Sequence, residues 1–162
     1  MPVAGRGVAD FVPALLASER TVAQLSREEL ARAASRYEPC LSAAHVGLYE
    51  LGRRAPQLST LTALARGLGV EVRALLVPVD TADLARLRVE AGIRQRDLAR
   101  MLGLTQARWS RTERGLAAAE APVLVRAAGA LGRSYDVVAH SAAHTRRTAL
   151  CGSLQSGHGC AK

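Results

Sequence analysis

One short stretch of the chain carries side chains suited to hydrogen bonding with a large polar partner. Gln106, Ala107, Ser110 and Arg111 lie at spacings that place them on one face of a helix. A glutamine amide can bond adenine N6 and N7, an arginine guanidinium can bond guanine O6 and N7, and an alanine methyl can contact the thymine methyl group. This face therefore fits the edges of DNA bases, with roughly 1–3 kcal/mol of discrimination from each bidentate pair.

Two short helices and a tight turn must hold this face. Periodicity predicts one helix over residues 95–102, in which the small side chain of Ala99 allows a close helix crossing. Gly103 ends this helix in the left-handed conformation, and a second helix over residues 105–114 begins at a threonine cap. Trp109 is the inward apolar residue of the second helix, so the polar face points away from the core.

The same arrangement occurs twice along the chain. The clear copy covers residues 80–139 and is expected to begin with a helix over residues 81–90. A blurred copy covers residues 8–77, ahead of the clear copy. Matching residues of the two copies lie 68 positions apart at first, and 63 positions apart after a five-residue insertion within residues 35–40 of the blurred copy. A self-repeat of this length indicates two similar small domains.

The clear copy resembles the Cro/phage-repressor (Xre-type) helix-turn-helix family, and the blurred copy resembles it more weakly. The residues that carry the resemblance are Gln95, Leu98, Ala99, Leu102, Gly103, Gln106, Trp109, Glu113 and Gly115. It implies an all-α fold of two tandem helical bundles, each a lambda-repressor-like helix-turn-helix domain of four to five helices. Residues 140–162 have no counterpart and are expected to form a basic, disordered tail.

The resemblance also implies roles for individual side chains. In this family one glutamine contacts the DNA backbone and a second reads a base, and these match Gln95 and Gln106. The next reading positions match Ala107 and Arg111. Phosphate contacts are expected from the flanking side chains, namely Thr105, Arg108, Ser110 and Arg114. These eight residues form the predicted DNA-binding site, in which the helix over residues 105–114 enters the major groove of double-stranded DNA.

The family pairs an arginine of its first helix with a glutamate near the end of its third. The matching residues are Arg88 and Glu113 in the clear copy, and Arg20 and Glu50 in the blurred copy. Because both members occur in both copies, the resemblance extends to residues 8–77. These pairs are expected to be structural.

The blurred copy departs from the pattern at its reading positions. The residues that match Gln106, Ala107, Arg108 and Arg111 are Ala43, Ala44, His45 and Leu48. Arg27 stands where the clear copy has Gln95. Such a helix offers few hydrogen-bonding groups to base edges. We therefore expect residues 80–139 to supply specificity, and residues 8–77 to support binding, form a homodimer or contact a protein partner.

Composition agrees with a partner of negative charge. The net charge is +8, and residues 81–140 hold ten arginines against six acidic residues. A basic balance raises affinity for phosphate backbones. No apolar run approaches the ~18 residues of a membrane span, and three cysteines form no even framework, which favours a cytoplasmic, nucleoid-associated protein. No spacing indicates catalytic residues, a cofactor or a metal site, so an enzyme is not expected.

Two functions remain open at this point. The first is a sequence-specific transcriptional regulator, most simply a repressor that occludes a promoter. The second is a protein-interaction module, such as an antitoxin that neutralises a partner protein or a coactivator-like adaptor, with DNA binding secondary. The apolar reading positions of residues 8–77 favour the second function for that half of the chain.

Overall fold

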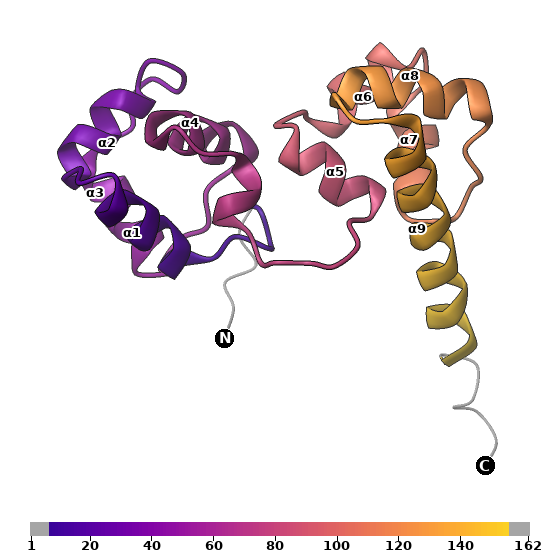
Figure 1. Ribbon diagram of the computed structural model, residues 1–162, viewed down its shortest axis with the longest axis horizontal. Coiled ribbons are helices and arrows are strands. Elements are labelled where there is room, and N and C mark those ends of the chain that lie inside the picture. The colour runs from indigo at the N-terminus through magenta and orange to yellow at the C-terminus, as the bar shows by residue number, and fades with distance from the viewer. Residues whose placement is uncertain (1–6, 156–162) are drawn as a thin grey trace. The chain divides into compact units, whose positions relative to one another are not determined.

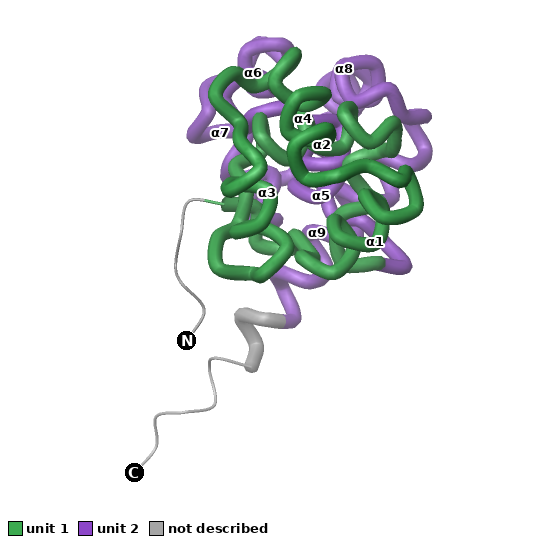
Figure 2. The backbone as a smooth tube through the Cα atoms, turned by 90° about the vertical axis from the view of Figure 1, so that its left-hand side faces the viewer, with its two compact units in different colours: residues 1–78 green, residues 79–162 purple. Residues whose placement is uncertain are grey.

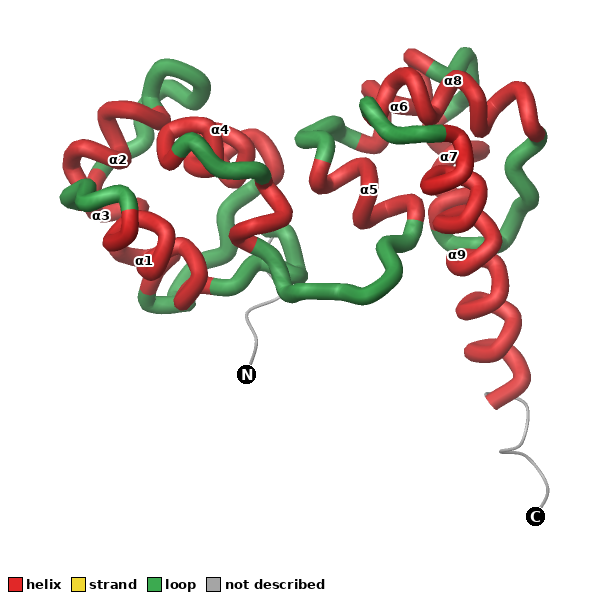
Figure 3. Tube along the Cα trace, in the orientation of Figure 1, coloured by secondary structure: helices red, strands yellow, loops and turns green. Residues whose placement is uncertain are grey.

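The computed structural model of the chain describes residues 7–155. The chain divides into two compact units, Met1–Pro78 (unit 1) and Val79–Lys162 (unit 2), which are coloured separately in Figure 2. Over the described residues the regular structure is helical, with no strand beyond one isolated bridge (Figure 3). The expected all-α architecture of two tandem helix-turn-helix bundles is confirmed.

Over its described residues, 7–78, unit 1 contains four α-helices and one 3₁₀ turn (Figure 1). They are α1 (Pro13–Val22), α2 (Arg27–Ala34), α3 (Ala43–Glu50), α4 (Leu58–Leu68) and η1 (Val72–Leu75). Local chemistry sets their ends. The expected capping box forms at Ser26, whose hydroxyl accepts from the Glu29 amide at 3.1 Å while the Glu29 carboxylate accepts from the Ser26 amide at 2.8 Å. Gly69 ends α4 at a φ of +72°.

The core of unit 1 is aliphatic. Its fully buried side chains include Leu16, Leu30, Leu61 and Leu64, which come from α1, α2 and α4. The predicted insertion forms the loop after α2, since residues 35–40 connect Ala34 to the start of α3. The loop between α2 and α3 is therefore longer than the turn of a tight helix-turn-helix.

Between residues 79 and 155, the described part of unit 2, the chain forms five α-helices. They are α5 (Leu84–Glu90), α6 (Gln95–Met101), α7 (Gln106–Glu113), α8 (Ala121–Leu131) and α9 (Tyr135–Gln155). Helix α5 begins three residues later than the expected start at residue 81. Asp83 is the cap, and its carboxylate accepts from the Arg86 amide at 2.7 Å. Trp109, Leu84 and Leu98 are fully buried in the core that the helices enclose.

Helix α9 corrects the expectation of a disordered tail from residue 140. The helix continues to Gln155, and Val138, Ser141 and Thr145 are buried at helical spacing. The Thr145 hydroxyl accepts from the Leu84 amide at 3.1 Å and donates to the Ser141 carbonyl at 2.8 Å, so it satisfies a free amide at the start of α5. Small polar residues form this contact, so hydropathy gave no sign of it. Residues 156–162 of the expected tail lie outside the described residues.

Candidate nucleic-acid interface

The turn between α6 and α7 forms as the sequence predicts. Ala99 is 1% exposed, which lets α7 pack closely on α6. Gly103 has a φ of +69°, a conformation that L side chains adopt at a cost of about 1–2 kcal/mol. The Thr105 hydroxyl then accepts from the Arg108 amide at 3.2 Å and caps α7. Trp109 is 0% exposed, so the phase of α7 is fixed with its aromatic side chain in the core.

This phase leaves the predicted reading residues at the surface. Gln106, Ala107 and Arg111 are exposed, and Ser110 is half-buried. The Gln106 amide nitrogen lies 3.4 Å from Oε1 of Gln95, so the two glutamines from different helices meet. Arg111 has no ion pair within the described residues. The exposed face of α7 therefore presents an amide, a methyl and a guanidinium group in one row.

The predicted phosphate-binding residues lie around that row. Thr105, Arg108 and Arg114 are exposed. Arg108 forms an ion pair with Glu120 at 3.0 Å, with both side chains more than half exposed. Exposed pairs of this kind contribute about 0–1 kcal/mol, so Arg108 can exchange this carboxylate for a phosphate. Arg114 donates from Nε to the Ser110 carbonyl at 3.3 Å.

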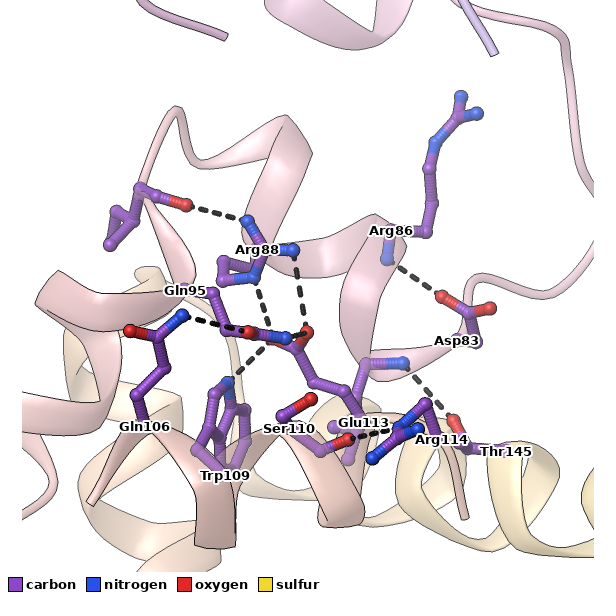
Figure 4. Close-up of polar contacts among 12 residues, drawn as sticks. Asp83, Arg86, Arg88, Gln95, Gln106, Trp109, Ser110, Glu113, Arg114 and Thr145 are labelled. Atoms are coloured by element: carbon purple, nitrogen blue, oxygen red, sulfur yellow. Dashed lines mark hydrogen bonds and ion pairs between the residues drawn. The ribbon is translucent and has the colours of Figure 1, made fainter. Parts of the chain in front are cut away.

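A buried carboxylate holds α5, α6 and α7 together beneath this face (Figure 4). The Glu113 side chain is 3% exposed and accepts from Nε of Arg88 at 2.6 Å, from the Gln95 amide at 2.8 Å and from Trp109 Nε1 at 2.5 Å. Arg88 also donates to the Ile93 carbonyl at 3.0 Å. The expected Arg88–Glu113 pair is thus present. The hydrogen bond to the Glu113 carboxylate also fixes the Gln95 side chain at the start of α6.

Unit 1 repeats the arginine–glutamate part of this arrangement, with Val46 at the position of Trp109. Arg20 donates from Nε to Glu50 at 2.5 Å and from Nη1 to the Leu25 carbonyl at 2.9 Å. Arg27, at the position of Gln95, donates to the same carboxylate at 2.7 Å. The expected Arg20–Glu50 pair is therefore present. The charged guanidinium of Arg27 therefore contacts the buried carboxylate of unit 1, whereas the neutral amide of Gln95 does so in unit 2.

Electrostatics around Glu50 follow from these two arginines. Burial of the Glu50 carboxyl raises its pKa, but hydrogen bonds from Arg20 and Arg27, together with their charges, outweigh burial and bring the pKa below its usual value. The hydrogen bond to Glu50 is also the largest cause of the raised pKa of Arg20. The ionised pair is therefore the stable form in folded unit 1.

Unit 1 is expected to lose stability in acid through this group. The unfolded glutamate has a pKa of about 4.3, above the folded pKa of Glu50. As the pH falls, the unfolded chain therefore takes up the proton first. The stabilisation is complete above the unfolded pKa and disappears as the pH falls through the folded pKa. Thermal unfolding between about pH 6 and about pH 3 will show a steeper loss for wild type than for Glu50→Gln.

The unfolding signal of each unit can be separated in this experiment. Trp109 is the single tryptophan of the chain and lies in unit 2, so its fluorescence follows unit 2 alone. A transition seen by circular dichroism but absent from tryptophan fluorescence belongs to unit 1. Equal pH slopes for wild type and Glu50→Gln in that transition would contradict the assignment.

The reading positions of α3 differ in kind from those of α7. Ala44 is exposed and Leu48 half-buried, so neither offers a hydrogen bond to a base edge. His45 is occupied locally, because its Nδ1 lies 3.3 Å from the Ser42 amide and 3.0 Å from the Ser42 hydroxyl, where it completes a capping box. Leu51, just after α3, is 62% exposed. This face is apolar and largely without free polar groups.

Several interactions that position the interface were not foreseen. Arg126 of α8 donates to the Leu102 carbonyl at 3.2 Å and satisfies the end of α6. Arg86 and Arg133 both contact Glu90, at 2.9 Å and 3.4 Å, and Arg86 is 6% exposed. The Glu90 spacing from Arg86 is i, i+4, which sequence analysis could have used. The other contacts join elements far apart in sequence and left no local pattern.

The last two observations on this part of the structure concern metal binding and membrane insertion. Among residues 7–155, no group of three or more histidine, cysteine, aspartate or glutamate side chains is arranged to hold a metal ion. No described helix is long and apolar enough to cross a membrane.

Comparison with known families agrees with the geometry of both units. A family model described as "Helix-turn-helix" matches residues 18–75, and one described as "Helix-turn-helix domain" matches residues 82–140. Neither the curated proteins nor the solved structures contain a match to the chain. The matching domain families are generally not enzymes. The chain belongs to the Cro/phage-repressor type of helix-turn-helix protein, a family of DNA-binding transcription regulators, and carries the domain twice in tandem.

Proposed function

We propose that the chain is a sequence-specific transcriptional regulator that binds double-stranded DNA through unit 2 and acts most simply as a repressor. The observation that supports this most is the exposed row of Gln106, Ala107 and Arg111 on α7. A helix with these groups can hydrogen bond in the major groove while its buried side holds the core. Such a protein would act at the nucleoid in the cytoplasm.

The eight predicted residues divide into readers and positioners in this proposal. Gln106 reads adenine, Ala107 contacts a thymine methyl and Arg111 reads guanine. The phosphate contacts come from Gln95, Thr105, Arg108, Ser110 and Arg114 and fix the register of α7 on the duplex. The hydrogen bond between Gln106 and Gln95 supports this division, because it couples the base-reading side chain to the one beside the backbone.

Unit 1 is proposed to bind protein, either a second copy of the chain or another partner. The apolar face of α3 supports this role, since Leu51 is exposed and the polar group of His45 is used in a cap. A homodimer would place two copies of α7 on paired half-sites. If the partner is a different protein, the chain would act as an antitoxin or an adaptor, with DNA binding secondary.

Removal of the Arg111 guanidinium is expected to relax specificity. Binding sites selected from random duplex DNA near physiological salt will give a compact consensus with wild type. Arg111→Ala will lose preference at one base pair by roughly 10- to 100-fold, the equivalent of one bidentate contact. Leu48→Ala, the matched change in α3, will leave the base preferences within each half-site unchanged.

Two results would contradict this reading. Absence of any enriched sequence with wild type would remove the proposed function and leave the protein-interaction alternative. Altered base preferences within a half-site for Leu48→Ala would move base reading to unit 1. A protein that co-purifies with the chain after nuclease treatment and high salt would support the antitoxin or adaptor role.

A further inference from the structure

Helix α9 lies directly against the C-terminal end of α7. Gly115, two residues after the last residue of α7, has a φ of +71°. A Cβ placed on Gly115 would lie 2.7 Å from the Thr145 carbonyl oxygen, 2.7 Å from Cβ of Ala149 and 3.1 Å from Cα of Arg146. The absence of a side chain at Gly115 therefore allows the backbone of α9 to touch the end of the proposed recognition helix.

The two arginines of α9 differ in their orientation towards this contact. Thr145 is buried and Ala149 half-buried, so these residues define the inward side of α9. With 3.6 residues per turn, Arg146 is rotated by about 100° from Thr145 and Arg147 by about 200°. Arg146 thus flanks the contact with α7, while Arg147 points away from it. Both side chains are exposed.

Charge near this contact is positive. Arg111 and Arg114 lie at the end of α7 and are exposed, and the Arg146 backbone adjoins Gly115. Helix α9 contains no acidic residue after Asp136. Neither Arg146 nor Arg147 has an ion pair within the described residues. The guanidinium of Arg146 therefore extends the basic surface of α7 onto a second helix.

We propose that Arg146 binds a DNA phosphate next to the base pairs contacted by α7. This inference rests on the function proposed for unit 2. It adds to the interface a residue that lies beyond those matched by the helix-turn-helix families, since that match ends at residue 140. The contact of α9 with Gly115 fixes the distance between Arg146 and α7, so the guanidinium meets the duplex at a set position.

The test compares Arg146→Ala with Arg147→Ala in the full chain. Both variants lose one positive charge from the same helix, so they differ only in the side from which it is lost. Affinity for duplex DNA carrying the selected consensus is measured from about 50 to about 200 mM salt. Arg146→Ala will weaken binding on the order of ten-fold at about 0.1 M salt and reduce the slope of log K against log salt by about 0.9. Arg147→Ala will change both quantities little.

Additional variants separate this proposal from the function on which it rests. Arg146→Lys will retain most of the affinity, because a phosphate accepts either cation. Equal effects of Arg146→Ala and Arg147→Ala would overturn the proposal, since only net charge would matter, and so would wild-type affinity and slope for Arg146→Ala. If Arg111→Ala relaxes the consensus in either case, the function of α7 survives and only the role of Arg146 is lost. If wild type selects no consensus, both fall. Tryptophan fluorescence must show unchanged stability for each variant.

Discussion

Arg88→Met will lower the free energy of unfolding of unit 2 by about 3–5 kcal/mol. The Glu113 carboxylate is 3% exposed, and Arg88 is its charged partner. Removal of the guanidinium leaves a buried negative charge with only the Gln95 amide and the Trp109 indole as donors. Loss of one partner of a buried pair costs about 3–5 kcal/mol because the remaining charge is uncompensated. In a domain of this size the melting temperature should fall by more than about 10 °C.

The measurement is urea or thermal unfolding of the full chain followed by the fluorescence of Trp109. This indole is itself a donor to Glu113, so its emission also reports the local change. Arg20→Met is the matched control, because it removes the equivalent partner from Glu50 in unit 1. It should destabilise unit 1 by circular dichroism and leave the Trp109 transition in place. A loss below about 1 kcal/mol for Arg88→Met would show that the pair behaves like an exposed one.

Both arginine–glutamate pairs were predictable because two independent patterns located them. The resemblance named the positions, and the repeat placed Arg20 and Glu50 where Arg88 and Glu113 lie. The structure adds that the residue opening the second helix also contacts the carboxylate, as Gln95 in unit 2 and Arg27 in unit 1. Sequence alone treated Arg27 as a replacement for a DNA contact. It could not indicate that the buried carboxylate would bind this guanidinium.

Local chemistry also predicted the elements around the candidate interface. Gly103, Thr105 and Trp109 fix the turn, the start and the phase of α7, and each acts within a few residues of its own position. The start of α5 was placed too early because Asp83 competes as a cap with residues just before it. Boundaries of this kind depend on a single hydrogen bond, to which periodicity is insensitive.

The extent of α9 was not predictable by the same reasoning. Its inward residues after Val138 include Ser141 and Thr145, which hydropathy assigns to a surface or a tail. They are buried because they meet the start of α5, more than fifty residues away in sequence. Gly115 marks this contact instead. It is one of the residues that carry the family resemblance, but its close contact with α9 appears only when the two helices are seen together.

Gly115→Ala will destabilise unit 2 by about 2–5 kcal/mol. The alanine must adopt a φ of +71°, which costs about 1–2 kcal/mol. Its Cβ would also lie 2.7 Å from the Thr145 carbonyl oxygen and from Cβ of Ala149, closer than atoms in contact approach. The neighbour is helix backbone and cannot rotate away, so α9 must shift. Forced shifts of this kind cost about 1–3 kcal/mol more.

Gly103→Ala isolates the part of this loss that comes from α9. Gly103 has nearly the same conformation, with a φ of +69°, but a Cβ there meets no atom within 4 Å. Unfolding followed by Trp109 fluorescence should therefore show about 1–2 kcal/mol for Gly103→Ala and a larger loss for Gly115→Ala. Equal losses would mean that α9 does not press on Gly115 in solution. Because Thr145 caps α5 from the same helix, a displaced α9 also frees the Leu84 amide. The contact at Gly115 thus couples the end of the proposed recognition helix to the start of the first helix of its unit.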